Sequence, residues 1–212
     1  MPNYVRNIVK FKGTPTQIAQ IKEYMQTEEN KFDFNKVFPL PKDLNLPSGS
    51  DEDIAIPCAK ARRKGKTTCE SYENISWAQK KTFEEWAELG ELYLINLEKY
   101  GATTWYDWCC NHWGTKWNAM DVVWNDDTVQ FDTAWATPEP IFKKLSRLFP
   151  DIAFEVSYAD EDIGNNCGMM EWNENGFRET YYNDSVSFAC EVWGLDPEDY
   201  LKEVEDGAET CY

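Results

Sequence analysis

The sequence lacks the features of exported proteins, membrane proteins and common zinc proteins. It has one histidine and no Cys-x-x-Cys motif, so the usual spacing of zinc ligands is missing. No run of eighteen apolar residues occurs, and the first residues lack the apolar core of a signal peptide. We therefore expect a cytoplasmic protein without a membrane segment, a metal or a cofactor.

Phosphate-binding and disulfide motifs are missing as well. The chain contains neither G-x-G-x-x-G nor a Walker sequence. Seven cysteines are an odd number, and in a chain without an export signal they predict buried thiols rather than a disulfide framework.

Acidic residues are abundant, and they are concentrated at one end. The formal net charge is −17. Residues 151–212 hold seventeen acidic and two basic residues, whereas residues 1–66 hold eight acidic and twelve basic residues. Concentrated charge costs self-repulsion, so this asymmetry favours a function for the acidic end.

The first part of the chain predicts a strand, a helix and a second strand. Residues 4–12 alternate as a half-exposed strand does, and residues 14–25 begin with a capping box followed by a helical stripe. Phe32, Phe34 and Phe38 predict a second strand that ends at Pro39. Residues 44–66 are interpreted as a loop, and residues 83–100 as a helix that ends at Gly101.

The second part predicts two hairpins and further helices. Residues 122–124 and 129–135 flank a turn, residues 139–148 form a helix, and residues 152–158 alternate as a strand. A second hairpin spans residues 167–181 and turns at Asn175-Gly176. The segments 184–193 and 197–204 predict helices, the second of them capped by Asp196.

These elements predict an α+β fold with an antiparallel sheet, in the order β-α-β, helical insertion, β-α-β. We expect a ferredoxin-like domain at residues 1–181 with a helical insertion at about 70–117, an extra hairpin, and an acidic helical extension at residues 182–212.

An aromatic tract carries a family resemblance. Residues 105–119 read WYDWCCNHWGTKWNA, and further matching segments are 2–7, 34–41, 133–138 and 158–161. The chain resembles the YubB-type ferredoxin-like family, whose members come from phages, prophages and plasmids. The resemblance implies a ferredoxin-like fold and an origin in a mobile genetic element, and it implies no known activity.

Catalysis has one candidate site, and metal binding has two. A zinc site would require distant segments to converge, and core packing is favoured for its candidate ligands, which are Cys58, Cys69, Cys109 or Cys110, and His112. Cys110 and His112, with Asp107 nearby, are a possible nucleophile and base, but no nucleophile elbow precedes them, and packing roles are favoured. Asp160, Glu161 and Asp162 are clustered carboxylates that lack the ligand spacing of a calcium loop, so a solvated acidic loop is favoured over a metal site.

Nucleic-acid binding is the second functional hypothesis. Trp105, Trp108, Trp113 and Trp117 are potential base-stacking residues, but their spacing favours core packing. The basic run of residues 60–66 contains the candidate phosphate contacts Arg62, Arg63, Lys64 and Lys66. The strongly acidic net charge opposes a polyanionic ligand, so nucleic acid ranks below a protein partner.

The leading hypothesis is a non-catalytic interaction protein with an acidic C-terminal face. Such a face suits a basic partner protein of the host or of the mobile element, including a nucleic-acid-handling protein that the chain inhibits as an anti-defence factor. The remaining alternative is an enzyme that uses Cys110 and His112. The candidate partner-binding residues are Asp160, Glu161, Asp162, Glu198, Asp199, Glu203, Glu205 and Asp206.

Overall fold

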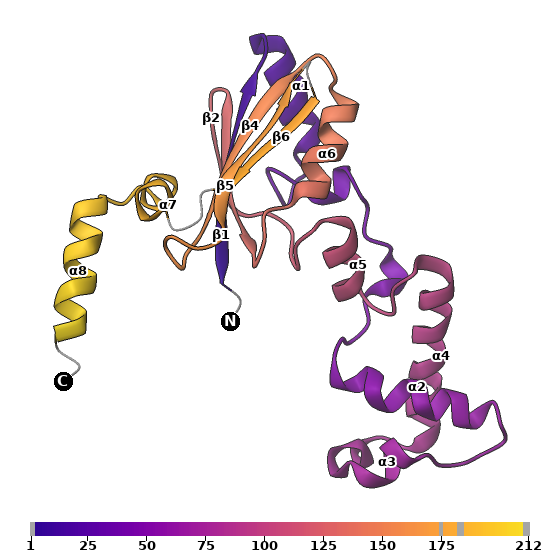
Figure 1. The fold of residues 1–212 in the computed structure, drawn as a ribbon. Helices are drawn as coiled ribbons and strands as arrows, with labels where there is room; N and C mark the ends of the chain where they lie inside the picture. Colours follow the sequence, from indigo (N-terminus) through magenta and orange to yellow (C-terminus); the bar gives the residue numbers. More distant parts are fainter. Residues whose placement is uncertain (1–2, 174–175, 182–184, 210–212) are drawn as a thin grey trace. The chain divides into compact units, whose positions relative to one another are not determined.

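A computed structural model describes residues 3–173, 176–181 and 185–209 of the chain. It divides into two compact units (Figure 1). One unit comprises Met1–Pro39 and His112–Tyr212, and the other comprises Leu40–Asn111. We call them the sheet unit and the inserted unit.

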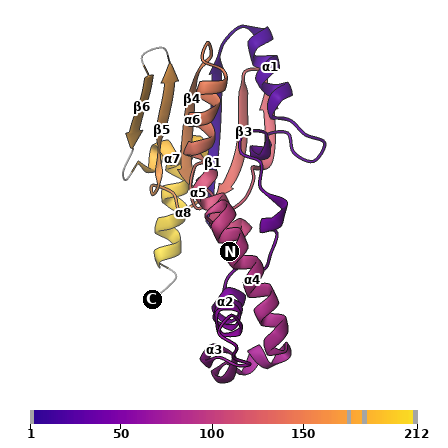
Figure 2. The same cartoon turned by 90° about the vertical axis from the view of Figure 1, so that its right-hand side faces the viewer.

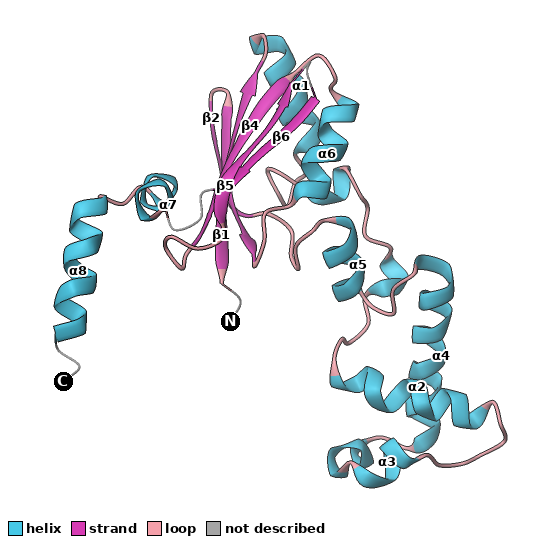
Figure 3. Ribbon diagram, in the orientation of Figure 1, coloured by secondary structure: helices cyan, strands magenta, loops and turns pink. Residues whose placement is uncertain are grey.

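The sheet unit is built on a six-stranded sheet (Figure 3). Its strands are β1 (Tyr4–Lys12), β2 (Met120–Asn125), β3 (Thr128–Ala134), β4 (Ala153–Asp160), β5 (Cys167–Asn173) and β6 (Gly176–Tyr181). The strand order is β2-β3-β1-β4-β5-β6, and every neighbouring pair is antiparallel. The predicted α+β class and the antiparallel sheet are therefore confirmed.

Helices cover the two faces of the sheet differently. The helices of the sheet unit are α1 (Pro15–Met25), α6 (Glu139–Leu148), α7 (Val186–Trp193) and α8 (Pro197–Glu209). In Figures 1 and 2, α1 and α6 lie on one face and α7 on the other. The buried core lies under α6, where the Phe142 ring contacts Phe131, Phe154 and Trp172 at centroid distances of 5.8 to 6.3 Å.

Capping residues fix the helix starts as the sequence predicts. The Thr14 side chain accepts a hydrogen bond from the Gln17 backbone N–H and starts α1. Asp196 caps α8 by accepting from the backbone N–H groups of Glu198 and Asp199. The predicted turn residue Asn175 lies outside the described residues, and so does Asp184.

The predicted second strand at Phe32–Phe38 is wrong. The segment contains the 3₁₀ helix η1 (Phe34–Lys36), which begins where the Asp33 carboxylate accepts from the Asn35 backbone N–H. Phe32 and Phe34 are nevertheless fully buried, because both rings pack on Phe131. Alternating aromatic residues in a capped turn imitate the pattern of a strand.

A polar clamp joins the two segments of the sheet unit that flank the insertion. Asn118 Nδ2 donates to Asp33 Oδ1 at 2.7 Å, and the Phe34 backbone N–H donates to Asn118 Oδ1 at 2.9 Å. Asn30 Nδ2 donates to the Ala119 carbonyl at 2.8 Å. The segment that follows the insertion thus contacts the segment that precedes it, just before β2 begins.

The inserted unit consists of helices and short turns. It contains α2 (Ser50–Arg62), α3 (Glu70–Asn74), α4 (Phe83–Tyr100), η2 (Lys42–Leu44), η3 (Ser76–Lys80) and most of α5 (Trp105–His112). It begins well before the predicted residue 70, because residues 50–62, interpreted as loop, form α2 around an internal Pro57. Ile54, Ala55 and Cys58 supply its buried stripe.

Helices α2 and α4 cross closely at Gly90. A Cβ atom on Gly90 would lie 1.9 Å from the Ala55 carbonyl oxygen and 2.8 Å from the Ala59 Cβ. Only a residue without a side chain permits this approach. The glycine therefore sets the distance between the two helices.

We predict that Gly90→Ala destabilises the inserted unit. In an exposed helix, Gly→Ala stabilises by up to about 1 kcal/mol, but overpacking here reverses the sign and costs about 2–3 kcal/mol. Urea unfolding followed by tryptophan fluorescence measures the difference, with Glu88→Ala on an exposed position of α4 as the control. A stabilising Gly90→Ala would contradict the close crossing.

We predict that the Asp33 clamp makes stability fall in acid. Desolvation raises the pKa of Asp33, but hydrogen bonds from Asn118, Asn35 and Thr27 outweigh it, so the pKa lies below the ordinary 3.8. A lowered folded-state pKa stabilises the fold above pH 3.8, and this contribution is lost as pH falls through the folded value.

Asp33→Asn tests this contribution by urea unfolding at pH 7 and pH 3. We expect the free energy of unfolding of the variant to be about 1–2 kcal/mol lower than that of the wild type at pH 7. The difference between the two proteins is expected to be smaller at pH 3. An equal difference in unfolding free energy at both pH values would show that the charge of Asp33 does not stabilise the fold.

Candidate functional site

Trp193, at the end of α7, fixes the acidic C-terminal end to the sheet. Its indole N–H donates to the carbonyl oxygens of Ala159 and Asp160 at 3.1 and 3.0 Å. The Arg6 guanidinium lies 4.1 Å from the Trp193 ring centroid and forms a two-bond ion pair with Asp132. The end of α7 therefore has a defined place on β1 and β4.

The loop that follows β4 lies beside the start of α7. A Cβ on Gly164 would sit 3.3 Å from Val186 Cγ2, and the partly buried Ile163 packs against the cluster of Ala189 and Val192. This loop contains Glu161 and Asp162, which are both exposed. The acidic loop after β4 therefore contacts helix α7, which leads to the acidic helix α8, although more than twenty residues separate the loop from α7.

Asp160 does not belong to the exposed acidic residues. Its side chain is buried at 6% exposure, and its carboxylate accepts from Asn3 Nδ2, the Asp162 backbone N–H and Asn166 Nδ2. A carboxylate with these bonds holds the loop in place. Among the residues predicted to bind a partner, Asp160 is therefore a buried residue that stabilises the loop.

Helix α8 adds acidic and apolar side chains that are both exposed. Glu198, Asp199 and Glu203 are exposed acids, while Leu201 and Val204 are 48% and 51% exposed. Lys202 forms an ion pair with Asp199 at 3.2 Å. The side chains of Glu205 and Asp206 lie outside the described residues.

We define the acidic surface by its exposed acids that the structure describes. They are Glu161, Asp162, Glu191, Asp196, Glu198, Asp199 and Glu203. Among the described side chains, Lys202 is the one base that forms an ion pair with any of them. Most of these carboxylates therefore form no ion pair with a described base.

The predicted basic run contributes less free charge than its sequence indicates. Arg62 forms ion pairs with Glu84 and Glu91, and both Glu91 carboxylate oxygens accept from Arg63 Nε at 3.0 Å. These bonds raise the pKa values of both arginines. Lys64 and Lys66 are exposed. Two of the four candidate phosphate contacts thus pair with helix α4.

The tryptophans of the aromatic tract are mainly packing residues. Trp108 and Trp113 are buried, and the Trp113 indole N–H donates to the Phe38 carbonyl at 2.9 Å. Trp105 and Trp117 are partly buried. The Lys116 ammonium lies 4.6 Å from the Trp117 ring centroid and 5.0 Å from that of Trp135. This tract has no continuous exposed row of rings.

The two cysteines of this tract are buried to different degrees. Burial raises the pKa of the Cys109 thiol to about 12, which suppresses the thiolate. Cys110 is partly buried beside Tyr106, whose pKa is raised by desolvation and then by the charges of Cys110 and Asp107. The His112 ring packs edge-on against Phe38. No group of three metal-ligating side chains occurs among the described residues.

A groove between α6 and the second hairpin was missed by sequence reasoning. Its volume is about 400 Å³. The lining residues are Lys143, Ser146, Arg147, Pro150, Ile152, Trp172, Asn173, Gly176 and Phe177. Phe177 is 48% exposed and packs 4.7 Å from the Trp172 ring centroid. We call this the α6 groove, and it combines two exposed cations with an exposed aromatic ring.

Comparison with known proteins identifies the domain type. Residues 112–205 match the family model described as "Ferredoxin-like domain in Api92-like protein". These residues belong to a ferredoxin-like domain. The matched segment is somewhat less than half of the chain, and it contains β2 to β6, α6 and α7.

Among solved structures, the chain has low similarity to a protein of the same description. The crystal structure of protein Api92 from Yersinia pseudotuberculosis has 10% sequence identity and a TM-score of 0.43, covering 85% of this chain and 99% of that chain. The curated proteins include no match. None of the described helices is long and apolar enough to cross a membrane.

The face of the central strands that carries Arg6 is mainly polar. On β1 this face also carries Tyr4, Ile8, Lys10 and Lys12, and on the neighbouring strand β3 it carries Thr128, Gln130, Asp132 and Ala134. Tyr4, at the first position of β1, is the one aromatic residue among them. These two strands therefore present no row of aromatic rings for base stacking.

Proposed function

We propose that the chain is a non-catalytic interaction protein of a mobile genetic element, and that its acidic surface binds a basic partner protein. The observation that carries the proposal is the acidic surface itself. Trp193 anchors the end of this surface that lies nearest the sheet, through its hydrogen bonds to β4. Its exposed carboxylates steer a basic partner by long-range attraction, because few described bases neutralise them.

The proposal includes the kind of partner. A protein that handles nucleic acid presents a basic groove, and an acidic surface occupies such a groove by charge complementarity. Binding there inhibits the partner without any catalytic residue, as an anti-defence protein would. The resemblance to phage and plasmid proteins supports this biological setting.

We predict that charge changes on α8 abolish partner capture. Replacing Glu198, Asp199, Glu203, Glu205 and Asp206 by Lys reduces retention of a basic protein from nuclease-treated bacterial lysate by about tenfold or more. Because Lys in the first turn opposes the helix dipole, Glu198→Gln, Asp199→Asn and Glu203→Gln form a milder companion variant.

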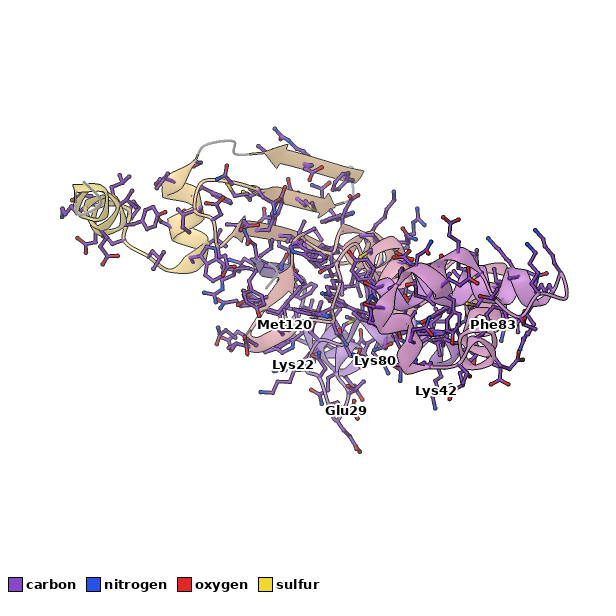
Figure 4. All side chains as sticks on the ribbon, turned by 90° about the horizontal axis from the view of Figure 1, so that it is seen from below. Lys22, Glu29, Lys42, Lys80, Phe83 and Met120 are labelled. Atoms are coloured by element: carbon purple, nitrogen blue, oxygen red, sulfur yellow. The ribbon has the colours of Figure 1, made fainter. Side chains whose placement is uncertain are left out.

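The matched control changes Glu23, Glu28 and Glu29 to Lys. These three acids are exposed near the end of α1, and Figure 4 shows Glu29 extending outward from the ribbon. The control is expected to retain the partner at low salt and to release it at high salt, as the wild type does. Equal capture by the α8 variants and the wild type would contradict the proposal.

A second candidate function is binding of single-stranded nucleic acid in the α6 groove. The specific observation in its favour is that Lys143, Arg147 and the exposed Phe177 line one groove. Cations contact phosphates and an aromatic ring stacks on a base, in the manner of single-strand binders. The net charge of −17 places this candidate second.

We predict distinct effects of two substitutions on oligonucleotide binding at low salt. Phe177→Ala removes one stacking contact and weakens binding roughly 5- to 150-fold. Arg147→Ala weakens binding and lowers the salt slope by about 0.7, the value for one contact to single-stranded nucleic acid. Fluorescence anisotropy with labelled DNA and RNA measures both changes.

Lys64→Ala provides the control, because this exposed lysine lies in the basic run and does not line the α6 groove. An unchanged affinity for Phe177→Ala, or a loss confined to Lys64→Ala, would exclude the α6 groove as the binding site.

A further inference from the structure

Two thiols of the inserted unit lie in direct contact. Cys58 is on α2, and Cys69 immediately precedes α3. Their sulfur atoms are 3.2 Å apart. The two residues are eleven positions apart, so the contact closes a short loop that contains the whole basic run of residues 60–66.

The two thiols differ in exposure. Cys58 is fully buried in the cluster of Ile54, Ala55 and Trp86, whereas Cys69 is partly exposed at the edge of the same cluster. A reagent in solution therefore reaches Cys69 first. The buried thiol stands directly behind it.

We propose that Cys58 and Cys69 are an oxidative modification site, at which a small disulfide such as oxidised glutathione converts the two thiols into an intramolecular disulfide. The sulfur atoms must approach by about 1 Å to reach the bonded distance of about 2.05 Å. The disulfide forms only when an oxidant is present, and in the structure both cysteines, like the other described cysteines, are free thiols.

The exchange balances in two steps. The Cys69 thiolate attacks one sulfur of the glutathione disulfide, forms a mixed disulfide and releases one glutathione thiolate, which takes up a proton. Cys58 then loses its proton and attacks the Cys69 sulfur, which releases the second glutathione. Overall, two protein thiols are oxidised to one disulfide, and one glutathione disulfide is reduced to two thiols.

The surroundings assign the order of the two steps. Desolvation and then the hydrogen bond and charge of Cys69 raise the pKa of Cys58 to about 12, so Cys58 is a poor initial nucleophile. Once Cys69 carries glutathione, the Cys58 sulfur is the thiol in contact with it, which favours the second step.

The disulfide connects α2 to α3 and stabilises the inserted unit. Closing a loop of about twelve residues restricts the unfolded chain and raises the melting temperature by on the order of 10 °C. It also restrains the turn after Arg62, where the exposed Lys64 and Lys66 lie.

The test treats the full chain with oxidised glutathione and measures intact mass and peptide maps. We expect the wild type to lose two hydrogen atoms, to carry no lasting adduct at Cys69, and to yield a peptide pair linked through Cys58 and Cys69. Cys58→Ala is expected to retain glutathione on Cys69. Cys69→Ala is expected to form neither product at Cys58, and Cys110→Ala to behave as the wild type.

Several results would overturn the proposal. They are a lasting glutathione adduct on Cys69 in the wild type, a disulfide between other cysteines, and absence of any reaction at Cys69. Circular dichroism checks folding, and if Cys58→Ala does not fold, the comparison of wild type with Cys69→Ala decides. Equal melting temperatures of the oxidised and reduced wild type would refute the stabilising role.

Discussion

The architecture depends on the polar clamp formed by Asn30, Asp33 and Asn118. Hydrogen bonds between backbone and side-chain groups tie the segment after α1 to the segment before β2. The buried polar groups must be satisfied, and here each segment satisfies the other. The strands therefore assemble into one sheet although the inserted unit interrupts the chain between these two segments.

The inserted unit has its own core and its own close contact. Ile54, Trp86 and Tyr93 belong to one buried cluster, and Gly90 permits the crossing of α2 and α4. The Trp86 indole N–H donates to the Ala78 carbonyl at 2.8 Å, so even this large ring leaves no unpaired donor. These contacts are all within residues 40–111, as expected for a compact unit.

Local signals in the sequence predicted the regular elements well. The capping box of Thr14 and the left-handed Gly101 mark helix ends by mechanisms that act within a few residues. Strand alternation likewise identified β1 and β4. Prediction failed where a local pattern was ambiguous, as at Phe32 and Phe34, whose rings fill the core from a capped turn.

The candidate sites depend on contacts between distant segments, and these were less predictable. The sequence indicates the acidic end, but it does not show that Asp160 is buried or that Arg63 pairs with Glu91. It also gives no sign that Arg147 and Phe177, thirty positions apart, line one groove. A residue's charge is visible in a sequence, whereas its partners are fixed only by tertiary packing.

The central place of β1 has a consequence for synthesis on the ribosome. This strand is translated first, but its two neighbours in the sheet are β3 and β4, which end at Ala134 and Asp160. The N-terminal strand must therefore wait unpaired for most of the chain to emerge. The inserted unit, whose core cluster lies within residues 40–111, can complete its core during that delay. The nascent chain thus acquires a folded helical part before it acquires its sheet.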